Sequence, residues 1–413
     1  MSGQTPWLID GRTGREVSYS DLLVRLNRRP LDACALHQAV DTAAVLEGIA
    51  VAIVHETDLV LFDADFGDDE IAALGFERSQ INQPRPLENP VGVDQALLQK
   101  QAGGASRARL GLFTSGSTGL PKLVLQGISN LARAVKVSSR RAEAVWALAY
   151  NPTHVAGVQV YLQALANGCS LLDVYGMNRT GVYGALERYK VTHLSATPSF
   201  YRLLLPMDRP LLAVKSVTLG GESADAKLLA KVQELFPNAR IHNVYASTEA
   251  GTLLVAADEV FAIAPGLEGK VAVRDGKLSV HHTLLGEFVG FAAVDDWYDT
   301  GDVIETVSEQ PLRFRIVARE RDWVNVGGSK VNPNEVESVL AEHGGVTQAR
   351  VFGRKNSVMG NLLCAEVVPG VPVPTEVELR SFLAERLQPF KIPRVIRFVD
   401  SLGTTRSGKL SRT

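Results

Sequence analysis

Cysteine is scarce in this sequence. The three residues, Cys34, Cys169 and Cys364, are far apart and odd in number, and their spacing is not that of a metal site. A disulfide framework is therefore not expected. This favours a reducing compartment, and we expect a cytoplasmic protein.

Excess charge of either sign is also lacking. Lys and Arg number 43 against 45 Asp and Glu, for a net charge of −2, so no global field would draw the chain to nucleic acid or anionic lipid. We expect no nucleic acid partner, and any polyanion must be bound locally. The N-terminus has no basic start followed by an apolar run, and no uncharged apolar stretch reaches membrane-spanning length. Export and membrane insertion are not expected.

Length and hydrophobic content, by contrast, suffice for a folded protein of several domains. At about 150 residues per domain, 413 residues predict two or three domains, and 46% hydrophobic against 21% charged residues exclude a disordered chain. Short β-rich runs at 59–62, 110–113 and 216–219 alternate with helical patterns such as the one over 223–236. This alternation predicts an α/β body.

The final hundred residues read as a series of short alternating elements. The expected elements are a strand at 312–317, a helix at 334–342, strands near Arg350 and Leu363, a helix at 375–387 and a strand at 395–399. Thr375 and Glu378 form a capping-box pattern at the start of the second helix. The pattern predicts a separate small α+β domain that begins near residues 318–322.

The segment Thr114-Ser-Gly-Ser-Thr-Gly-Leu-Pro-Lys122 concentrates small and hydroxyl-bearing residues. Its hydroxyls belong to Thr114, Ser115, Ser117 and Thr118, its glycines are Gly116 and Gly119, and Lys122 closes it. Glycines let a backbone approach a ligand closely, and hydroxyls, N–H groups and an ammonium suit phosphate oxygens. The segment therefore favours a polyphosphate cradle.

A P-loop and a surface turn are the two alternatives to a phosphate cradle in this segment. A nucleotide-binding P-loop needs a different Gly-Lys spacing and a following helix, whereas Leu-Val-Leu after Lys122 is extended. The loop is therefore expected to join two strands. A Ser/Gly-rich surface turn remains the alternative, because such turns are common in loops.

Together with five later segments, in matching order and spacing, this loop resembles the adenylate-forming superfamily of acyl-CoA synthetases, nonribosomal-peptide adenylation domains and beetle luciferases. The segments are Gly220-Gly-Glu222, Asn243-Val-Tyr-Ala-Ser-Thr-Glu249, Tyr298-Asp-Thr-Gly-Asp302, Gly328-Ser-Lys-Val-Asn-Pro-Asn-Glu-Val-Glu337 and Ser407-Gly-Lys-Leu-Ser-Arg412. The resemblance covers most of the chain. It implies a large N-terminal α/β domain over 1–318 and a small mobile C-terminal α+β lid over 319–413.

The resemblance implies that ATP is bound with magnesium. It assigns the first loop to the β- and γ-phosphates, Thr248 to the α-phosphate and Glu249 to Mg²⁺. One carboxylate is chemically sufficient, because Mg²⁺ keeps waters and phosphate oxygens as its other ligands. Outside this motif, Glu249 would be read as a solvated surface charge.

The same resemblance places Tyr245 on the adenine and Asp302, assisted by Arg319, on the ribose hydroxyls. A carboxylate can accept from both hydroxyls of a vicinal diol. An ordinary turn and a surface arginine are the alternatives. The remaining residues implied for the nucleotide are Gly220, Gly221, Glu222, Asn243, Ala246 and Ser247.

Lys409 matches the family's catalytic lysine, which bridges the substrate carboxylate and the α-phosphate. His154, in Asn151-Pro-Thr-His-Val-Ala-Gly157, matches a residue beside the acyl carboxylate, although a satisfied core histidine is the alternative. The residues implied for the acyl group are His154, Gly157, Gly221 and Ala246. The segment lacks the aspartate that amino-acid-activating relatives use, which favours an acid without an α-amino group.

The implied reaction has two stages. A carboxylic acid reacts with ATP to give acyl-AMP, and the lid then rotates near Arg321 so that a pantetheine thiol, entering past Gly327 and Gly328, takes the acyl group. CoA is placed slightly ahead of an acyl carrier protein as the acceptor. An inactive nucleotide-binding homologue is the alternative from another class, although retention of Lys409, Glu249 and Asp302 argues against it.

The sequence departs from the family pattern at three points. The hinge reads Ala318-Arg-Glu-Arg-Asp322 where Gly-Arg-x-Asp-Asp is common, and Ala246 stands where glycine is common. Only 113 residues precede the first loop, fewer than in relatives. We therefore expect a shortened N-terminal lobe, with the loss between the early helix and Thr114.

Overall fold

The largest sheet of the computed structural model has eight strands. The structure describes residues 5–28, 32–87, 92–114, 121–288, 296–326, 329–356, 360–403 and 405. In spatial order the strands are β14 (Gly251–Ala256), β13 (Arg240–Ser247), β12 (Ser216–Gly220), β11 (His193–Ala196), β9 (Val145–Leu148), β10 (Ser170–Asp173), β1 (Pro6–Asp10) and β2 (Glu16–Ser18). The inner pairs are parallel and the two edge pairs are antiparallel.

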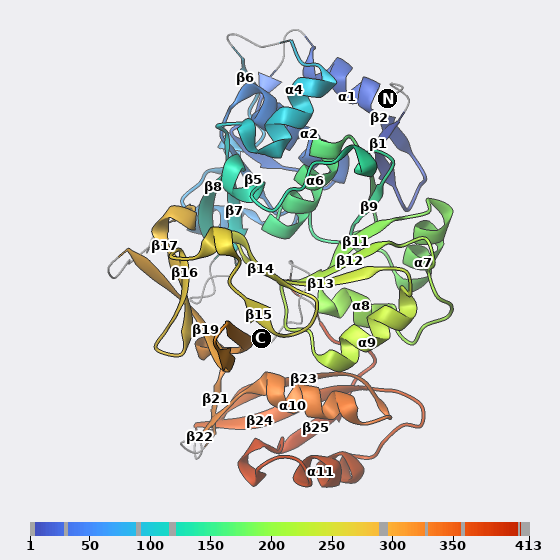
Figure 1. The fold of residues 1–413 in the computed structure, drawn as a ribbon, viewed down its shortest axis with the longest axis vertical. Coiled ribbons are helices and arrows are strands. Elements are labelled where there is room, and N and C mark those ends of the chain that lie inside the picture. The colour runs from blue at the N-terminus through green and yellow to red at the C-terminus, as the bar shows by residue number, and fades with distance from the viewer. Residues whose placement is uncertain are drawn as a thin grey trace.

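Both faces of this sheet are buried, because successive side chains of a strand point to opposite sides. Leu171 packs into one hydrophobic cluster and its neighbour Leu172 into another. The first cluster includes helices α1 (Tyr19–Leu26), α2 (Thr42–His55), α4 (Gln95–Lys100), α5 (Ile128–Leu131) and α6 (Val155–Asn167). The second includes α7 (Arg179–Arg188), α8 (Pro198–Leu203) and α9 (Ala226–Leu235), which lie on the right of Figure 1.

A second, five-stranded sheet carries the predicted phosphate loop. Its strands are β18 (Glu287–Phe288), β8 (Lys122–Gly127), β7 (Arg109–Thr114), β5 (Leu59–Phe62) and β4 (Leu36–Gln38), and α3 (Asp68–Ala73) follows β5. Thr114 and Lys122 pair across β7 and β8, so the prediction that the loop joins two strands is confirmed. Ser115, Gly116, Ser117, Thr118 and Gly119 lie outside the described residues. A two-stranded sheet of β3 (Asp32–Ala33) and β6 (Arg85–Pro86) completes this part of the chain.

A third sheet is antiparallel throughout. It consists of β15 (Phe261–Ala262), β20 (Leu312–Arg319), β19 (Trp297–Glu309), β17 (Lys277–His281) and β16 (Val271–Arg274). The strand expected at 312–317 is present as β20 and lies before the expected domain junction at 318–322. It pairs with β19 because the two strands form a long hairpin, and Phe314 is buried in the core of this sheet.

The C-terminal part forms the lower body in Figure 1. It contains β21 (Val324–Val326), β22 (Ser329–Val331), β23 (Val346–Asn356), β24 (Gly360–Pro369) and β25 (Val395–Phe398), with α10 (Pro333–Glu342) and α11 (Glu376–Ala384). Its hydrophobic cluster draws on residues from Val324 to Ile396. The Thr375 and Glu378 capping box is confirmed, although α11 ends at Ala384 rather than 387. Lys227 of α9 donates to the carbonyl of Ala341, which joins this body to the main one.

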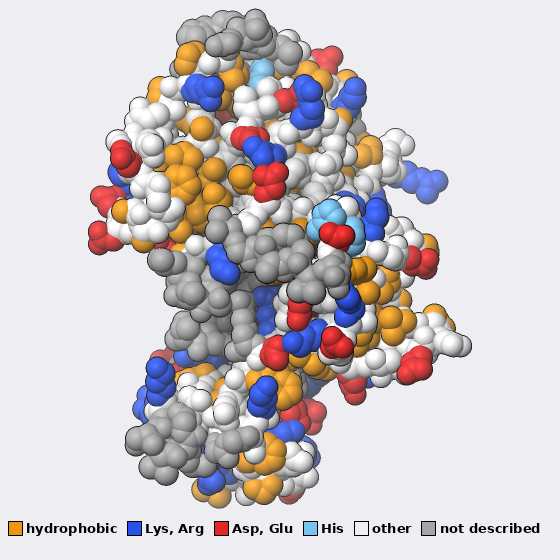
Figure 2. All heavy atoms as spheres, turned by 90° about the vertical axis from the view of Figure 1, so that its left-hand side faces the viewer, with side chains coloured by type: hydrophobic (Ala, Val, Ile, Leu, Met, Phe, Trp, Pro, Cys, Tyr) orange, Lys and Arg blue, Asp and Glu red, His pale blue; other side chains and the backbone are white. Residues whose placement is uncertain are grey.

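The surface mixes both signs of charge. On the face in Figure 2, basic and acidic side chains are interspersed among apolar ones, as the net charge of −2 leads one to expect. Among the helices that the structure describes, none combines the length and the apolar character needed to cross a membrane.

Candidate active site

Three predicted site residues from three strands meet at one carboxylate. We call Tyr245, Asp302 and Arg319 the Asp302 cluster. Asp302 is only 3% exposed. The Tyr245 hydroxyl donates to its Oδ2 at 2.5 Å, and Arg319 Nε donates to its Oδ1 at 2.9 Å. The arrangement depends on strand register, because Asp302 of β19 lies directly opposite Arg319 of β20.

The Asp302 carboxylate shifts the pKa of both of its partners in this cluster. Burial alone would lower the pKa of the Arg319 guanidinium, but the Asp302 carboxylate outweighs it and raises that pKa. Burial, assisted by the same carboxylate, raises the pKa of the Tyr245 phenol well above its usual value. A carboxylate offers about four lone-pair sites. The two occupied sites therefore leave capacity for the hydroxyls of a diol.

Thr248 and Glu249 lie in the turn between β13 and β14, and Gln126 of β8 holds that turn. The fully buried Gln126 donates through Nε2 to the carbonyls of Thr248 at 2.7 Å and Glu249 at 2.6 Å. The Glu249 carbonyl also accepts from the Gly286 N–H at 2.8 Å. The strand that follows the predicted phosphate loop is thus tied to the turn that carries the predicted metal ligand. Sequence reasoning missed Gln126, which belongs to no recognised motif.

The Gly-Gly-Glu segment ends β12. Gly221 has φ +87°, a left-handed conformation that side-chain-bearing residues rarely adopt, so glycine is required there. Glu222 Oε2 accepts from the Ser199 N–H at 2.9 Å, at the start of α8. The Gly220 carbonyl accepts from the buried Tyr150 hydroxyl at 3.3 Å. The structure thus gives all three residues a part in local geometry.

Asn243 and Ser247 of β13 form hydrogen bonds with nearby backbone groups. Asn243 is buried and donates to the carbonyl of Asp258 at 2.9 Å, while Ser247 Oγ accepts from the Ala250 N–H at 3.1 Å. The register of β13 against β14 shifts between Tyr245 and Ala246. These bonds fix the strand that presents Tyr245, and the predicted nucleotide contacts of Asn243, Ala246 and Ser247 stay predictions.

His154, the residue directly before α6, lies in a second polar group. Its Nε2 is 3.0 and 3.1 Å from the two carboxylate oxygens of Asp63, which is 4% exposed. Asn151 Nδ2 donates to Asp63 Oδ1 at 2.9 Å, and the Thr153 hydroxyl also donates to that carboxylate. We call Asp63, Asn151, Thr153 and His154 the Asp63 cluster.

The Asp63 carboxylate is held by hydrogen bonds rather than by an arginine. Burial alone would raise the pKa of its carboxyl group, but the hydrogen bond and charge of His154, with Thr153 and Asn151, outweigh burial and lower that pKa. Because a carboxylate oxygen accepts hydrogen bonds, Nε2 of His154 carries the hydrogen in this contact. Sequence reasoning missed Asp63. Its position directly after a buried strand was the available signal.

Gly157 packs against this cluster. A Cβ there would lie 2.2 Å from the carbonyl oxygen of Asn151, so no side chain fits in the first turn of α6. This close approach holds the Asn151–Pro152 turn against the helix. A direct contact between Gly157 and an acyl group stays a prediction.

Several predicted residues fall outside the described part of the chain or are described only in their backbone. Lys409, Gly327 and Gly328 are not described. Arg321 lies in the short turn of helix η6 (Glu320–Asp322), between β20 and β21. The predicted hinge therefore falls where the third sheet ends and the C-terminal sheet begins.

Comparison with protein families agrees with this geometry. The model of the AMP-binding enzyme family matches residues 39–274, and that of the AMP-binding enzyme C-terminal domain matches residues 335–409. The chain belongs to the AMP-binding enzyme family. The first match holds Asp63, His154 and Tyr245, and the second holds Lys409.

Several curated relatives of this chain are CoA ligases. The 3-[(3aS,4S,7aS)-7a-methyl-1,5-dioxo-octahydro-1H-inden-4-yl]propanoyl:CoA ligase of Mycobacterium tuberculosis is 28% identical over 95% of this chain and 80% of its own length. The 2-succinylbenzoate–CoA ligase of Bacillus pumilus is 25% identical over 73% of this chain and 67% of its own length. The chain spans 59% of the acetyl-coenzyme A synthetase of Bacillus subtilis. The predicted adenylate-forming superfamily and enzyme class, an acid–thiol ligase, are confirmed.

Solved structures confirm the fold class. A benzoate CoA ligase from Burkholderia xenovorans is 18% identical with a TM-score of 0.75, over 99% of this chain and 96% of the other. The o-succinylbenzoate CoA synthetase of Bacillus subtilis, in complex with ATP and magnesium ion, is 19% identical with a TM-score of 0.70, over 100% and 96%. The expected large N-terminal α/β part with a smaller C-terminal part is therefore correct.

Proposed function

We propose that the chain activates a carboxylic acid with ATP to give acyl-AMP and pyrophosphate, and then transfers the acyl group to the thiol of CoA. The observation that carries this proposal is the Asp302 cluster. It holds a buried carboxylate with free acceptor capacity, beside an aromatic ring and a fixed guanidinium, in a chain of the AMP-binding family. This combination suits a ribose diol next to a purine.

The proposal gives the chain's residues distinct tasks in adenylation. Asp302 accepts from the ribose hydroxyls while Arg319 keeps it oriented, and the ring of Tyr245 packs on adenine. Thr248 and Glu249 act at the α-phosphate and at Mg²⁺, whose chemistry is to neutralise phosphate charge. The support for this role of Glu249 is its turn, which Gln126 and Gly286 fix through the backbone so that its side chain stays available.

Residues 114–122 and Lys409 complete the nucleotide site in this proposal. The loop steadies the departing pyrophosphate, with Thr114 and Lys122 at its two ends on paired strands. Lys409 bridges the attacking carboxylate and the α-phosphate. A preorganised cation at such an oxyanion typically contributes about 10² to 10³ in rate.

On the acid side, we propose that His154 lies beside the substrate carboxylate and that Ala246 and Gly221 line the acyl pocket. The Asp63 cluster supports this, because it fixes an imidazole that would otherwise rotate about two side-chain bonds. The 319–413 unit is proposed as the lid, with Arg321 at its pivot. Gly327 and Gly328 would admit the slender pantetheine arm.

CoA is the acceptor we favour, since the curated relatives named above are CoA ligases. A carrier protein would present the same phosphopantetheine thiol, and a direct comparison decides between them. Purified enzyme that has formed acyl-AMP is mixed with CoA or with a carrier protein that bears a free phosphopantetheine thiol. The thioester product is identified by mass spectrometry. Thioester on CoA alone supports the proposal, and thioester on the carrier alone overturns this choice of acceptor.

The adenylation step is tested by exchange of labelled pyrophosphate into ATP across a panel of aliphatic, aryl and dicarboxylic acids. We expect exchange that depends on a particular acid and is lost in Lys409→Ala. The matched control is Lys355→Ala, which removes an exposed lysine of the same C-terminal part and should leave exchange unchanged. ATP binding without exchange for any acid would support the inactive homologue instead.

A further inference from the structure

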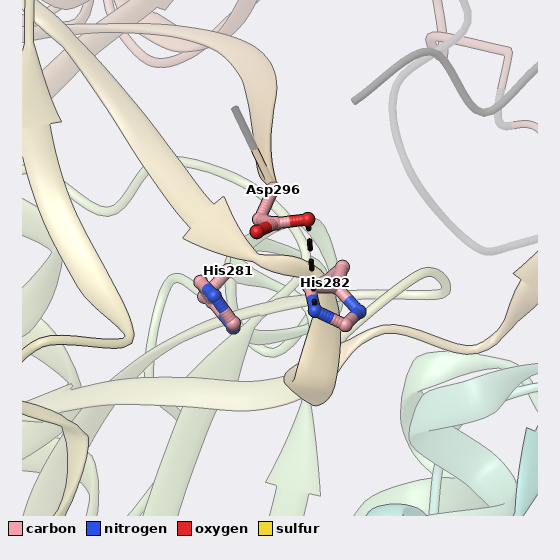
Figure 3. Close-up of side chains that lie close together, drawn as sticks. All are labelled: His281, His282 and Asp296. Carbon is pink, nitrogen blue, oxygen red and sulfur yellow. Dashed lines mark ion pairs between the residues drawn. The ribbon is translucent and has the colours of Figure 1, made fainter. Parts of the chain in front are cut away.

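Three potential metal ligands come together at one end of the third sheet, apart from every residue given a task above. His281 is the last residue of β17, His282 opens the short helix η5 (His282–Leu284), and Asp296 directly precedes β19. Figure 3 shows the Asp296 carboxylate facing the two imidazole rings. One ligand atom from each residue can be chosen so that all three lie within 4.8 Å of one another.

Main-chain bonds place these side chains. His281 pairs with Trp297 across β17 and β19, and the His282 N–H donates to the Asp296 carbonyl at 2.9 Å. Asp296 has φ +67°, an uncommon conformation for a residue with a side chain, though one that aspartate tolerates. The strand ladder therefore sets the spacing of the three residues before any ion binds.

The two imidazoles are also constrained by their neighbours. Thr283 Oγ1 lies 3.0 Å from Nδ1 of His281, and Trp297 packs edge-on against that ring with centroids 5.5 Å apart. The His281 and His282 ring centroids are 4.5 Å apart, and His282 Nε2 is 3.9 Å from Asp296 Oδ1. That separation is longer than a hydrogen bond, and it leaves both atoms able to turn toward a shared ion.

We propose that His281, His282 and Asp296 form a binding site for one divalent transition-metal ion of the zinc class. Two imidazoles and one carboxylate are a ligand set that suits Zn²⁺, Co²⁺ or Ni²⁺, with water in the remaining positions. Mg²⁺ prefers oxygen ligands, so the site is chemically distinct from the one proposed at Glu249. The proposal does not rest on the adenylation activity.

Occupation of this site would tie together β17 and β19. Asp302 lies six residues further along β19, and η5 leads into Gly286, whose N–H holds the carbonyl of Glu249. An ion that binds only the folded chain stabilises it by mass action. The metal is therefore expected to raise the melting temperature of the enzyme as well as to bind it.

The test uses the untagged full-length chain, freed of metal by a chelator and titrated with Co²⁺. Visible absorption reports imidazole coordination, and displacement by Zn²⁺ confirms a shared site. We expect one equivalent to bind, with affinity unaffected by millimolar Mg²⁺. His282→Ala and Asp296→Asn should each weaken binding at least about tenfold and abolish the metal-dependent rise in melting temperature. The His282 side chain is about half exposed and that of Asp296 is mostly exposed, so both variants should fold.

The matched control is His343→Ala, which removes an imidazole from the C-terminal body and should bind Co²⁺ like the unaltered chain. Equal affinity in both cluster variants and the unaltered chain would overturn the proposal, since the ion would then bind elsewhere. Failure of the unaltered chain to saturate with Co²⁺ below about 1 mM would overturn it too.

Discussion

The Asp302 cluster and the Asp63 cluster satisfy a buried carboxylate in different ways. Asp302 is paired with an arginine, a cation at every accessible pH, and with a phenol. Asp63 accepts from an amide, a hydroxyl and an imidazole, none of which carries a permanent charge. The first arrangement leaves part of the carboxylate's acceptor capacity unused, whereas the second uses that capacity to orient neighbouring side chains.

This difference predicts how the two clusters respond to substitution. Removing Asp302 leaves a guanidinium without its counter-ion and removes the proposed acceptor for the nucleotide. Replacing Asp63 with a neutral amide leaves hydrogen-bond donors facing an NH₂ group that cannot accept from them. The imidazole of His154 then loses the carboxylate that orients it. We therefore expect the two changes to affect different substrates.

Asp302→Ala should have the largest effect. Exchange of pyrophosphate into ATP should fall at least about 100-fold through the KM for ATP and kcat together, because the proposed acceptor for the ribose hydroxyls is lost. The free energy of unfolding should fall by about 2–3 kcal/mol, since a buried ion pair loses one partner while Arg319 keeps some access to solvent. Exchange kinetics and urea unfolding measure the two effects.

The control for this change is Asp299→Ala, three residues earlier on β19. Asp299 is exposed and lies 3.4 Å from Lys277, so its loss should cost under about 1 kcal/mol. Equal losses of exchange activity and of unfolding free energy in the two variants would contradict a special role for the buried, arginine-paired Asp302.

Asp63→Asn should have the second-largest effect on activity. The amide nearly keeps the shape of the carboxylate, but its NH₂ group cannot accept from Asn151, Thr153 and His154 at once. Activity should fall about 10- to 100-fold, mainly through the KM for the acid, because His154 loses its fixed orientation. Steady-state kinetics with acid and ATP varied separately make this distinction.

The exposed Asp65 offers a matched control, and Asp65→Asn should behave like the unaltered enzyme. A rise in the KM for ATP with an unchanged KM for the acid would contradict the assignment of the Asp63 cluster to the acid side.

Thr153→Val should have a smaller effect. It removes one donor to the Asp63 carboxylate at nearly constant volume, and a hydrogen bond to a charged group contributes about 1.5–3 kcal/mol. Urea unfolding should show a loss in this range. Thr347→Val, at an exposed position of the C-terminal sheet, should leave the free energy of unfolding nearly unchanged. An equal loss in both variants would contradict the stabilising role of the Thr153 hydroxyl.

The smallest expected effect is a dependence on pH of the contribution that Asp63 makes to the free energy of unfolding. Because the folded-state pKa of Asp63 is lowered, its contribution to stability is fully present above the unfolded pKa of about 3.9 and is lost as pH falls through the folded value. The difference in unfolding free energy between the unaltered chain and Asp63→Asn should therefore be constant near pH 7 and shrink below about pH 4. A difference that stays constant down to pH 3 would contradict this.

Local sequence predicted much of the fold and part of the site. The strand at 59–62 and the capping box at Thr375 depend on neighbours within a few residues, so periodicity and cap chemistry were sufficient. The strand at 312–317 is also present, as β20. Its own pattern indicated a strand, but only the hairpin with β19 determines which sheet it joins.

The site residues divide in the same way. Tyr245, Asp302 and Arg319 were found because they lie in recognisable motifs, and the structure brings them together. Asp63 and His154 are 91 residues apart, and Gln126 lies more than 120 residues from the turn that it holds. No local pattern marks such pairs, because their contact depends on how strands from different sheets are packed.

The sequence by itself determined the family, the alternation of strands and helices, and which segments would carry chemistry, because each of these is encoded in residue type and spacing. Tertiary structure alone decided which side chains share a carboxylate. Asp302 meets Arg319 through the register of β19 and β20, and Asp63 meets His154 where β5 ends beside the start of α6. A carboxylate's burial and hydrogen-bond partners arise only when distant strands pack, and they set both its pKa and the group that it can orient.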